Sequence, residues 1–296
     1  MNSNKMTVWG MLLKSAGMVY LFAVLVMIAL AWYQLRTVNE AAGKHVAVVN
    51  LEGEISASAD ANAASLIDNL DKAFADKDSV GVILRVNSPG GTVVQSGMVN
   101  DEIYRLKALY PAKKIVSVVE DVDASGAYYI SSATDDIYVD KGSIVGSIGV
   151  KLEGFDYTGA MKMLGVKRRT LTAGEHKEIV DSFAPMKHDE KRYLMGMLTK
   201  THDQFIKVIH KGRGDRLKDF PGLFSGLIWN GDDAIKLGLA DGYGTIGTVS
   251  RDLFKVEKTV VYGTHEGFVD HIMHKFGLSV ADGLRSMADA NGMVLK

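Results

Sequence analysis

Apolar runs alternate with helical patterns along the chain from residue 45 onwards. Three runs, residues 46–53 (VAVVNLEG), 80–87 (VGVILRVN) and 115–120 (IVSVVE), are apolar almost throughout, as strands covered on both faces are. Helix-like stretches over residues 64–74 and near 97–109 lie between them. Because this alternation is typical of βαβ units, we expect an α/β domain with a mostly parallel sheet and flanking helices.

The rest of the domain is less regular. Residues 188–212 have the pattern of a longer amphipathic helix, and a glycine-rich stretch follows. A helix-strand-helix unit around residues 232–255 and a run at 256–262 complete a domain that we place at residues 45–264. Residues 265–296 are predicted to form a helical extension. This extension carries an apolar stripe, which consists of Phe268, Val269, Ile272, Met273 and Phe276. We expect the stripe to pack on the core or on a neighbouring protomer rather than on a membrane surface.

A different pattern precedes this domain. Residues 15–35 contain no charged residue and are apolar on every face. About 20 helical residues at roughly 1.5 Å each match the ~30 Å hydrocarbon thickness of a bilayer. The stretch exceeds the h-region of about 7 to 15 residues in a cleaved signal peptide. We therefore predict an uncleaved transmembrane signal anchor at 15–35, after an N-terminal cytoplasmic tail at 1–14 and before a linker at 36–44.

The composition of the chain excludes several classes of function. The 296 residues are 47% hydrophobic and 23% charged, which is enough for one substantial core. The formal net charge of −1, with both signs interspersed, leaves no basic stripe for phosphates, so we expect no nucleic-acid partner. The absence of cysteine excludes a thiol nucleophile, a disulfide framework and thiolate metal sites.

Three short polar stretches could carry chemistry. The first is residues 87–91 (NSPGG), where two glycines can turn the chain sharply and leave a backbone N–H free for an oxyanion. The same five residues are equally typical of a simple turn. The second is residues 123–130 (DASGAYYI), which places Ser125 at the start of an expected helix. Helix N–H groups there would stabilise negative charge on an attacked carbonyl, but Ser125 could instead be an N-cap worth about 1 kcal/mol.

The third stretch is residues 172–179 (TAGEHKEI), which contains Lys177. A lysine has a reference pKa of about 10.4, so removing its proton at pH 7 costs roughly 4 to 5 kcal/mol unless burial lowers that cost. Only a desolvated lysine could therefore act as a base here, and a solvated surface charge is the ordinary alternative. His176, His188 and His202 keep a Ser-His-Asp arrangement open.

A metal or cofactor site has little support. The chain contains no H-E-x-x-H motif, and the i, i+3 spacing of His271 and His274 is explained by a helix face. We therefore expect neither a metal ion nor a cofactor.

Taken in order, the segments NSPGG, ASGAYYIS, GSIVGSIGV, TAGEHKEI and WNGDDAIKLGLADGYG resemble the signal peptide peptidase (SppA) family of serine peptidases, from about residue 45 to residue 243. This resemblance implies a Clp-protease-like or crotonase-like α/β fold, a Ser-Lys dyad and cleavage of residual signal peptides at the membrane. The short, single-copy form implies a homo-oligomer in which adjacent protomers build each active site. It further implies a bacterial inner-membrane protein with its N-terminus inside and the peptidase domain on the periplasmic side.

Matched position by position, the resemblance makes Ser125 the nucleophile and Lys177 the general base. It assigns the backbone N–H groups of Gly91 and Gly126 to the oxyanion hole, and Ser147 to a hydrogen bond that orients the lysine amine.

The sequence departs from the family pattern at two places. Ala127 stands where the family often has a second glycine, and an arginine usual near Leu227 is missing. The second difference puts the contact of that arginine in doubt and leaves the dyad untouched.

The expected function is hydrolysis of residual signal peptides or other membrane-derived peptides by a membrane-bound serine endopeptidase. Its subsites would accept small or aliphatic side chains. Three alternatives stay open: a stomatin-linked membrane protease with the same chemistry, a crotonase-like acyl-CoA enzyme with no need of Ser125, and a catalytically dead membrane scaffold.

Overall fold

The computed structural model describes residues 25–27, 29 and 43–263. Within these residues, no helix is both long enough and apolar enough to cross a membrane. The predicted anchor at 15–35 lies outside the described residues apart from positions 25–27 and 29. The tail at 1–14, most of the linker at 36–44 and the extension at 265–296 also lie outside them.

One sheet forms the centre of the domain, with the strand order β6-β5-β3-β2-β1-β8. Two further strands, β4 (Asp136–Val139) and β7 (Gly242–Tyr243), continue it beside β3. Every pair is parallel except β5 with β6. The prediction of a mostly parallel α/β sheet is therefore confirmed. The strands on the main path are β1 (His45–Glu52), β2 (Ser79–Ser88), β3 (Ile115–Ala124), β5 (Ile144–Gly146), β6 (Ile228–Asn230) and β8 (Thr259–Tyr262).

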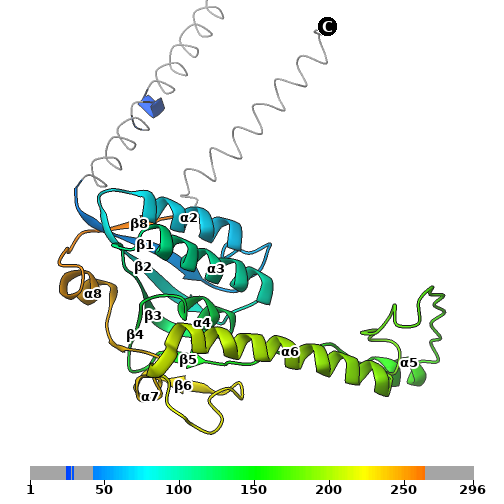
Figure 1. Ribbon diagram of the computed structural model, residues 1–296. Coiled ribbons are helices and arrows are strands. Elements are labelled where there is room, and N and C mark those ends of the chain that lie inside the picture. Colours follow the sequence, from blue (N-terminus) through cyan, green and yellow to red (C-terminus); the bar gives the residue numbers. More distant parts are fainter. Residues whose placement is uncertain (1–24, 28, 30–42, 264–296) are drawn as a thin grey trace, which may run out of the picture.

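Helices cover both faces of this sheet, which explains why its central strands are apolar throughout. One face packs against α2 (Ala63–Ala75), α3 (Val93–Leu109), α4 (Gly126–Ser131) and α6 (His188–Arg213) (Figure 1). The other face is covered by α8 (Ile246–Asp252) and the turn after it. The short helices η1 (Gly214–Arg216) and α7 (Gly231–Lys236) follow α6 in the chain.

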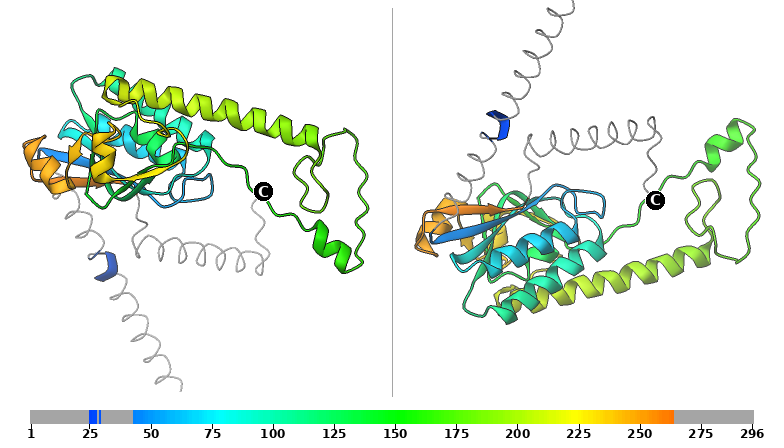
Figure 2. Two further views of the ribbon diagram at one scale, coloured as in Figure 1. Left: turned by 90° about the horizontal axis from the view of Figure 1, so that it is seen from below. Right: turned by 90° about the horizontal axis from the view of Figure 1, so that it is seen from above.

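The helix α6 begins at the predicted residue and ends one residue later than expected. Its C-terminal half is anchored in the core through Phe205, Ile209 and Arg213, whereas most of its N-terminal half is exposed. Figures 1 and 2 show α6 reaching well beyond the sheet. At its far end lies a projecting segment, residues 151–187, which contains α5 (Thr158–Met163) and which we call the arm.

The helix α3 begins at Val93, four residues before the predicted start. Thr92 is still extended, and Ser96 Oγ donates to the Thr92 carbonyl across the first turn. The connection from β2 to α3 is therefore short. It carries the Pro89-Gly90-Gly91 turn to the carboxyl edge of the sheet, where β3 also ends.

Candidate active site

Ser125 is the single residue between β3 and α4. Its backbone has φ 54° and ψ −122°, a conformation that costs a non-glycine residue about 1–3 kcal/mol. The Ser125 N–H donates to the Gly146 carbonyl at 2.8 Å, and the Ser125 carbonyl accepts from Tyr129 N–H at 3.0 Å. The side chain makes no capping hydrogen bond. Ser125 is thus an N-cap by position only, and its hydroxyl is not engaged in capping.

The glycine turn after β2 lies against this serine. Ile55 holds the turn from behind, because its N–H donates to the Gly90 carbonyl at 2.9 Å and its carbonyl accepts from Thr92 N–H at 2.8 Å. Gly90 has φ 94°, and a β-carbon added there would lie 2.8 Å from Ser125 Cβ and 2.5 Å from the Gly126 nitrogen. No side chain fits at this position, so the close approach of the two loops requires glycine.

Two backbone N–H groups converge beside Ser125. A β-carbon on Gly126 would lie only 3.1 Å from the Gly91 nitrogen, which shows how closely the two residues pack. Neither N–H donates a hydrogen bond to any atom in the described part of the chain. Gly126 also opens α4, so its N–H belongs to the positive end of that helix. This pair is what an oxyanion hole requires.

A cavity of about 800 Å³ brings these groups together. Ser125, Gly91 and Gly126 line it, and Ser147 lines it from the residue after β5. The Ser147 backbone also has positive φ, at 51°, and its N–H donates to the Leu227 carbonyl at 2.8 Å. Apolar contact surface comes from α3, α4 and α6 through Val93, Tyr129 and Phe205. The cavity therefore combines a serine hydroxyl and oxyanion donors with apolar walls.

Lys177 does not line this cavity. It lies on the arm, its side chain is exposed, and its backbone N–H donates to the Gly174 carbonyl at 3.3 Å. Within one protomer the structure does not bring Lys177 and Ser125 together. Lys151, at the base of the arm, is the one lysine among the described residues that line the cavity; it is exposed, and its ammonium pairs with Glu153 at 2.9 Å. Nothing in its local sequence distinguishes Lys151 from a surface lysine.

No histidine is among the described residues that line the cavity. His176 lies on the arm, where its Nδ1 approaches Glu190 Oε1 at 3.3 Å. His202 lies on α6, and its Nε2 is 3.1 Å from the Ile148 carbonyl. His188 is the exposed first residue of α6. Within a protomer, the geometry therefore gives no support to a histidine base.

A buried carboxyl group lies near the nucleophile in the chain. Asp123, two residues before Ser125 on β3, has no exposed surface, and neither of its carboxyl oxygens makes a hydrogen bond within the described residues. Burial raises the pKa of Asp123 to about 7, although the adjacent Ser131 hydroxyl and the charge of Arg213 oppose the rise. The local sequence does not distinguish Asp123, because an aspartate in the acidic run Glu120-Asp121-Val122-Asp123 at a strand end is typical of an exposed position.

The arm also carries a group of potential metal ligands. Glu175, His176 and Asp189 bring one ligand atom each to within 4.8 Å of the others, and all three side chains are exposed. Exposed acidic groups gather in this way without any ion, and His176 already contacts Glu190. The cluster gives no independent reason to assign a metal.

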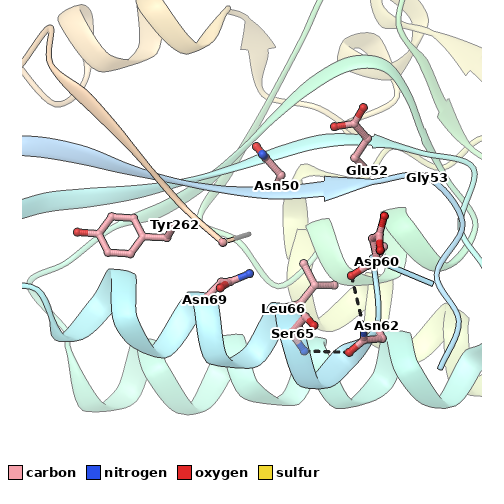
Figure 3. Close-up of a pocket in the computed structure, with 11 residues that line it drawn as sticks. Asn50, Glu52, Gly53, Asp60, Asn62, Ser65, Leu66, Asn69 and Tyr262 are labelled. Atoms are coloured by element: carbon pink, nitrogen blue, oxygen red, sulfur yellow. Dashed lines mark hydrogen bonds between the residues drawn. The ribbon is translucent and has the colours of Figure 1, made fainter. Parts of the chain in front are cut away.

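A second cavity, of about 710 Å³, lies toward the β8 edge of the sheet. Figure 3 shows it between the end of β1, the first half of α2 and the end of β8. Its lining is mostly polar, and Asn62 within it caps α2 by accepting from Ser65 N–H at 2.9 Å. None of the residues predicted to act in catalysis lines this cavity.

Comparison with known proteins gives the class of this chain. Residues 107–260, which contain Ser125, Ser147 and Lys177, match the model of Peptidase family S49. This match covers more than half of the 296 residues, so the chain belongs to Peptidase family S49. The predicted resemblance to SppA-type serine peptidases is therefore confirmed.

Individual relatives agree with this assignment. The chain is 35% identical over 240 residues to a candidate protease of Methanocaldococcus jannaschii, covering 78% of this chain and 75% of the relative. It is 31% identical to Protease 4 of Haemophilus influenzae over 73% of this chain and 35% of that protein. It is also 43% identical over 185 residues, or 62% of this chain, to the Na⁺/H⁺ antiporter NhaA of Brucella abortus. The aligned stretch is 25% of the antiporter, so this identity concerns a quarter of that protein.

Proposed function

We propose that the protein is a membrane-bound serine endopeptidase that hydrolyses residual signal peptides or other membrane-derived peptides through Ser125 and Lys177. One observation carries the proposal: Ser125, on a strained turn with its hydroxyl free of capping, shares a cavity with the N–H groups of Gly91 and Gly126, which donate to no atom in the described part of the chain. Membership of Peptidase family S49 supports the reaction class.

The chemistry begins with the neutral amine of Lys177, which takes the proton of Ser125 as Oγ attacks a peptide carbonyl. The developing oxyanion is held by Gly91 and Gly126 N–H groups, a type of contact worth roughly 3 to 4 kcal/mol per donor. The lysine ammonium then protonates the leaving amine, and an acyl-enzyme remains on Ser125. Water hydrolyses this ester and regenerates the serine.

The lysine comes from a neighbouring protomer. The arm exposes an unusual number of large apolar side chains for a monomer, which supports its burial against another copy of the chain. Because the same arm carries Lys177, docking it on a neighbour would bring the amine to that neighbour's Ser125. Ser147, which lines the cavity there, would accept or donate a hydrogen bond to orient the amine. The exposed large apolar side chains of the arm are Leu152, Phe155, Tyr157, Met163, Leu164, Val166, Leu171, Val180, Phe183 and Met186.

The membrane location rests on residues 15–35. With the N-terminus inside a bacterial inner membrane, the peptidase domain would lie on the periplasmic side, where cleaved signal peptides remain in the bilayer. An extended peptide in the Ser125 cavity is the natural pose, with small or aliphatic side chains in its apolar subsites. Accessibility of the domain to added protease in spheroplasts but not in intact cells would support this orientation. Protection in spheroplasts, with digestion only after the inner membrane is lysed, would refute it.

The dyad is tested by a mass-spectrometric peptide-cleavage assay on the full-length protein. Ser125→Ala and Lys177→Ala should each abolish turnover. Lys151→Ala is the matched control, because Lys151 is the lysine that lines the cavity within one protomer. It should keep most of the activity. Loss of activity in the Lys151 variant, with retention in the Lys177 variant, would transfer the role of base to Lys151.

Sharing of the site between protomers is tested by mixing. When inactive Ser125→Ala and Lys177→Ala proteins are co-assembled in equal amounts, about a quarter of the sites should receive an intact serine from one copy and an intact lysine from its neighbour. Activity should return accordingly. If the mixture stays inactive although mixed oligomers form, the two residues do not act across an interface.

A further inference from the structure

Asp123 is a buried acid that the proposed mechanism does not use. Its side chain has no exposed surface, and neither carboxyl oxygen makes a hydrogen bond with any described residue. Buried carboxylates normally accept several hydrogen bonds or face a cation, because an isolated charge in the protein interior is very costly. Asp123 lies two residues before Ser125 on the strand that carries the nucleophile, so its charge state bears on the site.

Among the described residues, the elements packed around Asp123 provide no free cation. From α6, Arg213 lies within electrostatic range, but its two Nη atoms donate to Asp241 at 2.8 and 2.9 Å and its Nε donates to the Gly238 carbonyl at 2.9 Å. From α4, the Tyr128 hydroxyl donates to the Leu239 carbonyl at 2.8 Å, and burial raises the pKa of Tyr128 well above its ordinary value. Both side chains already have partners.

The two neighbouring strands provide no charge either. Opposite Asp123 lie Ser88 on β2 and Val145 on β5. Ser88 Oγ donates to the Gly53 carbonyl at 2.6 Å, so it is engaged elsewhere. The remaining polar neighbour is Ser131, the last residue of α4, whose buried hydroxyl makes no hydrogen bond of ordinary geometry with a described residue. It is still close enough to Asp123 to oppose the effect of burial on the carboxyl pKa, but it does not outweigh that effect. The surroundings of Asp123 therefore suit a neutral carboxylic acid, which has an O–H to donate to Ser131.

We propose that Asp123 is a positioning residue that supports the Ser125 site as a neutral carboxylic acid and weakens that site when it ionises. The acid lies near the end of β3 and its neighbour Ser131 at the end of α4, so a hydrogen bond donated by the neutral acid to Ser131 would join the two elements between which Ser125 is held at positive φ. The kinetic part of this inference rests on the proposed peptidase function, whereas the protonation state of Asp123 does not.

Ionised Asp123 would weaken the site for an electrostatic reason, because negative charge develops on the oxygen of the attacked carbonyl. At about 3.3 Å per strand residue, the α-carbons of Asp123 and Ser125 are roughly 6–7 Å apart. A carboxylate buried on the same strand end as the nucleophile and shielded from water repels a negative oxyanion and offsets the N–H donors of Gly91 and Gly126. The neutral acid carries no such repulsion. Burial, which raises the pKa of Asp123 to about 7, favours the neutral form in the same way.

The test compares Asp123→Asn, which keeps the shape and cannot ionise, with the wild-type protein from about pH 5 to about pH 9. The ratio of kcat/KM between variant and wild type removes the titration of the lysine, which is common to both. We expect this ratio to rise with pH through the neutral range, by up to about tenfold per pH unit. A ratio that is flat or falls with pH would overturn the proposal. Asp121→Asn is the matched control, because Asp121 is exposed on the same strand, and its ratio should stay flat.

Two more measurements separate positioning from simple folding. Asp123→Asn should be more active than Asp123→Ala, because only asparagine restores a hydrogen-bonding group beside Ser131. Infrared spectroscopy of the full-length protein at about pH 5 to 6 should show the carbonyl band of a protonated, buried carboxyl group that is missing in Asp123→Asn. If every form lacks turnover, the peptidase function fails while the infrared band still tests Asp123. If no such band distinguishes the two proteins, Asp123 is ionised and the inference is wrong.

Discussion

Gly90 and Ser125 are in direct contact: a β-carbon added to Gly90 would lie 2.8 Å from Ser125 Cβ. Both residues have positive φ, and they come from turns that follow two adjacent strands, β2 and β3. The contact brings Gly91 and Gly126, whose N–H groups donate to no described residue, to the same cavity as the serine. The geometry of the site is thus determined by backbone packing at the carboxyl edge of the sheet.

Substitution of Gly90 should therefore abolish reactivity at Ser125. The added methyl group of Gly90→Ala meets backbone atoms of Ala124 and Gly126 at 2.6 and 2.5 Å, so the turn must move. We expect at least about a hundredfold loss in the rate at which a serine-directed phosphonate labels Ser125, as expected when oxyanion donors are displaced. Labelling is followed by intact-protein mass spectrometry.

The control for this experiment is Gly97→Ala. Gly97 lies on α3, and nothing is within 4 Å of an added β-carbon there. Because alanine favours helix over glycine, this variant should be as reactive as the wild type and more stable by roughly 0.5–1 kcal/mol. Equal loss of labelling in both variants would mean that the effect at Gly90 is not local.

A second prediction concerns the ion pair of Arg213 with Asp241, which joins the end of α6 to the chain before β7. Arg213 is 1% exposed, and both of its Nη atoms bond to Asp241. Removing the negative charge with Asp241→Asn leaves a buried guanidinium without its counter-ion. The expected loss is about 3–5 kcal/mol in the free energy of unfolding at neutral pH, measured by denaturant titration. Asp233→Asn breaks an exposed pair with Lys236 and should cost less than about 0.5 kcal/mol.

The pH dependence of this ion pair follows from the direction in which the pKa of Asp241 is shifted. Burial alone would raise the pKa of Asp241, but the hydrogen bonds and charge of Arg213 outweigh burial and hold the pKa below its ordinary value. A depressed pKa contributes stability above the unfolded-state pKa of about 4 and loses it as the pH falls through the folded-state pKa. The difference in unfolding free energy between wild type and Asp241→Asn should therefore shrink in acid. A constant difference would contradict this assignment.

A third prediction concerns substrate choice. Phe205, from α6, is buried, packs on Tyr129 with ring centroids 5.1 Å apart, and lines the Ser125 cavity. Phe205→Leu should enlarge the apolar pocket and shift preference toward bulkier side chains by roughly tenfold in the ratio of kcat/KM values, because a methylene is worth about 1–3 kcal/mol in such a pocket. Paired peptides that differ at one side chain measure the ratio. Phe220→Leu, at a partly exposed ring packed on Trp229, should leave it unchanged.

Much of the fold follows from local sequence because the physical signals are strong. The runs that became β1, β2 and β3 are apolar on both faces, and α6 carries a clear amphipathic period over its 26 residues. Even so, the start of α3 was placed four residues late. Its first turn contains the β-branched Val93 and Val94, which are exposed and resemble neither a cap nor a core stripe.

The site was less accessible to sequence reasoning. The position of Ser125 at a helix start was predictable, but its positive φ depends on tertiary contacts with Gly90 and Gly146 that no local pattern encodes. No local pattern shows that Lys177 lies on an exposed arm, because the position of the arm depends on residues far apart in the sequence. The pairing of Lys177 with Ser125 stays a prediction. Asp123 shows the same limit, because only the assembled layers of α4 and α6 bury it.

The last prediction is thermodynamic and concerns Asp123. Its pKa is raised to about 7 in the folded protein, above the unfolded value of about 4, so the folded state holds a proton that the unfolded state releases between these two values. Stability should thus be greatest below about pH 4 as far as this group is concerned, fall as the pH rises to about 7, and then level off. Asp123→Asn removes this dependence. Between about pH 5 and pH 8, the unfolding free energy of the variant should therefore rise by at least about 1 kcal/mol relative to that of the wild type. Denaturant titrations of the full-length protein measure this difference. If the stability advantage of Asp123→Asn over wild type instead grows as the pH falls, the folded protein stabilises Asp123 as a carboxylate. The inference that Asp123 is held as a neutral acid would then be wrong.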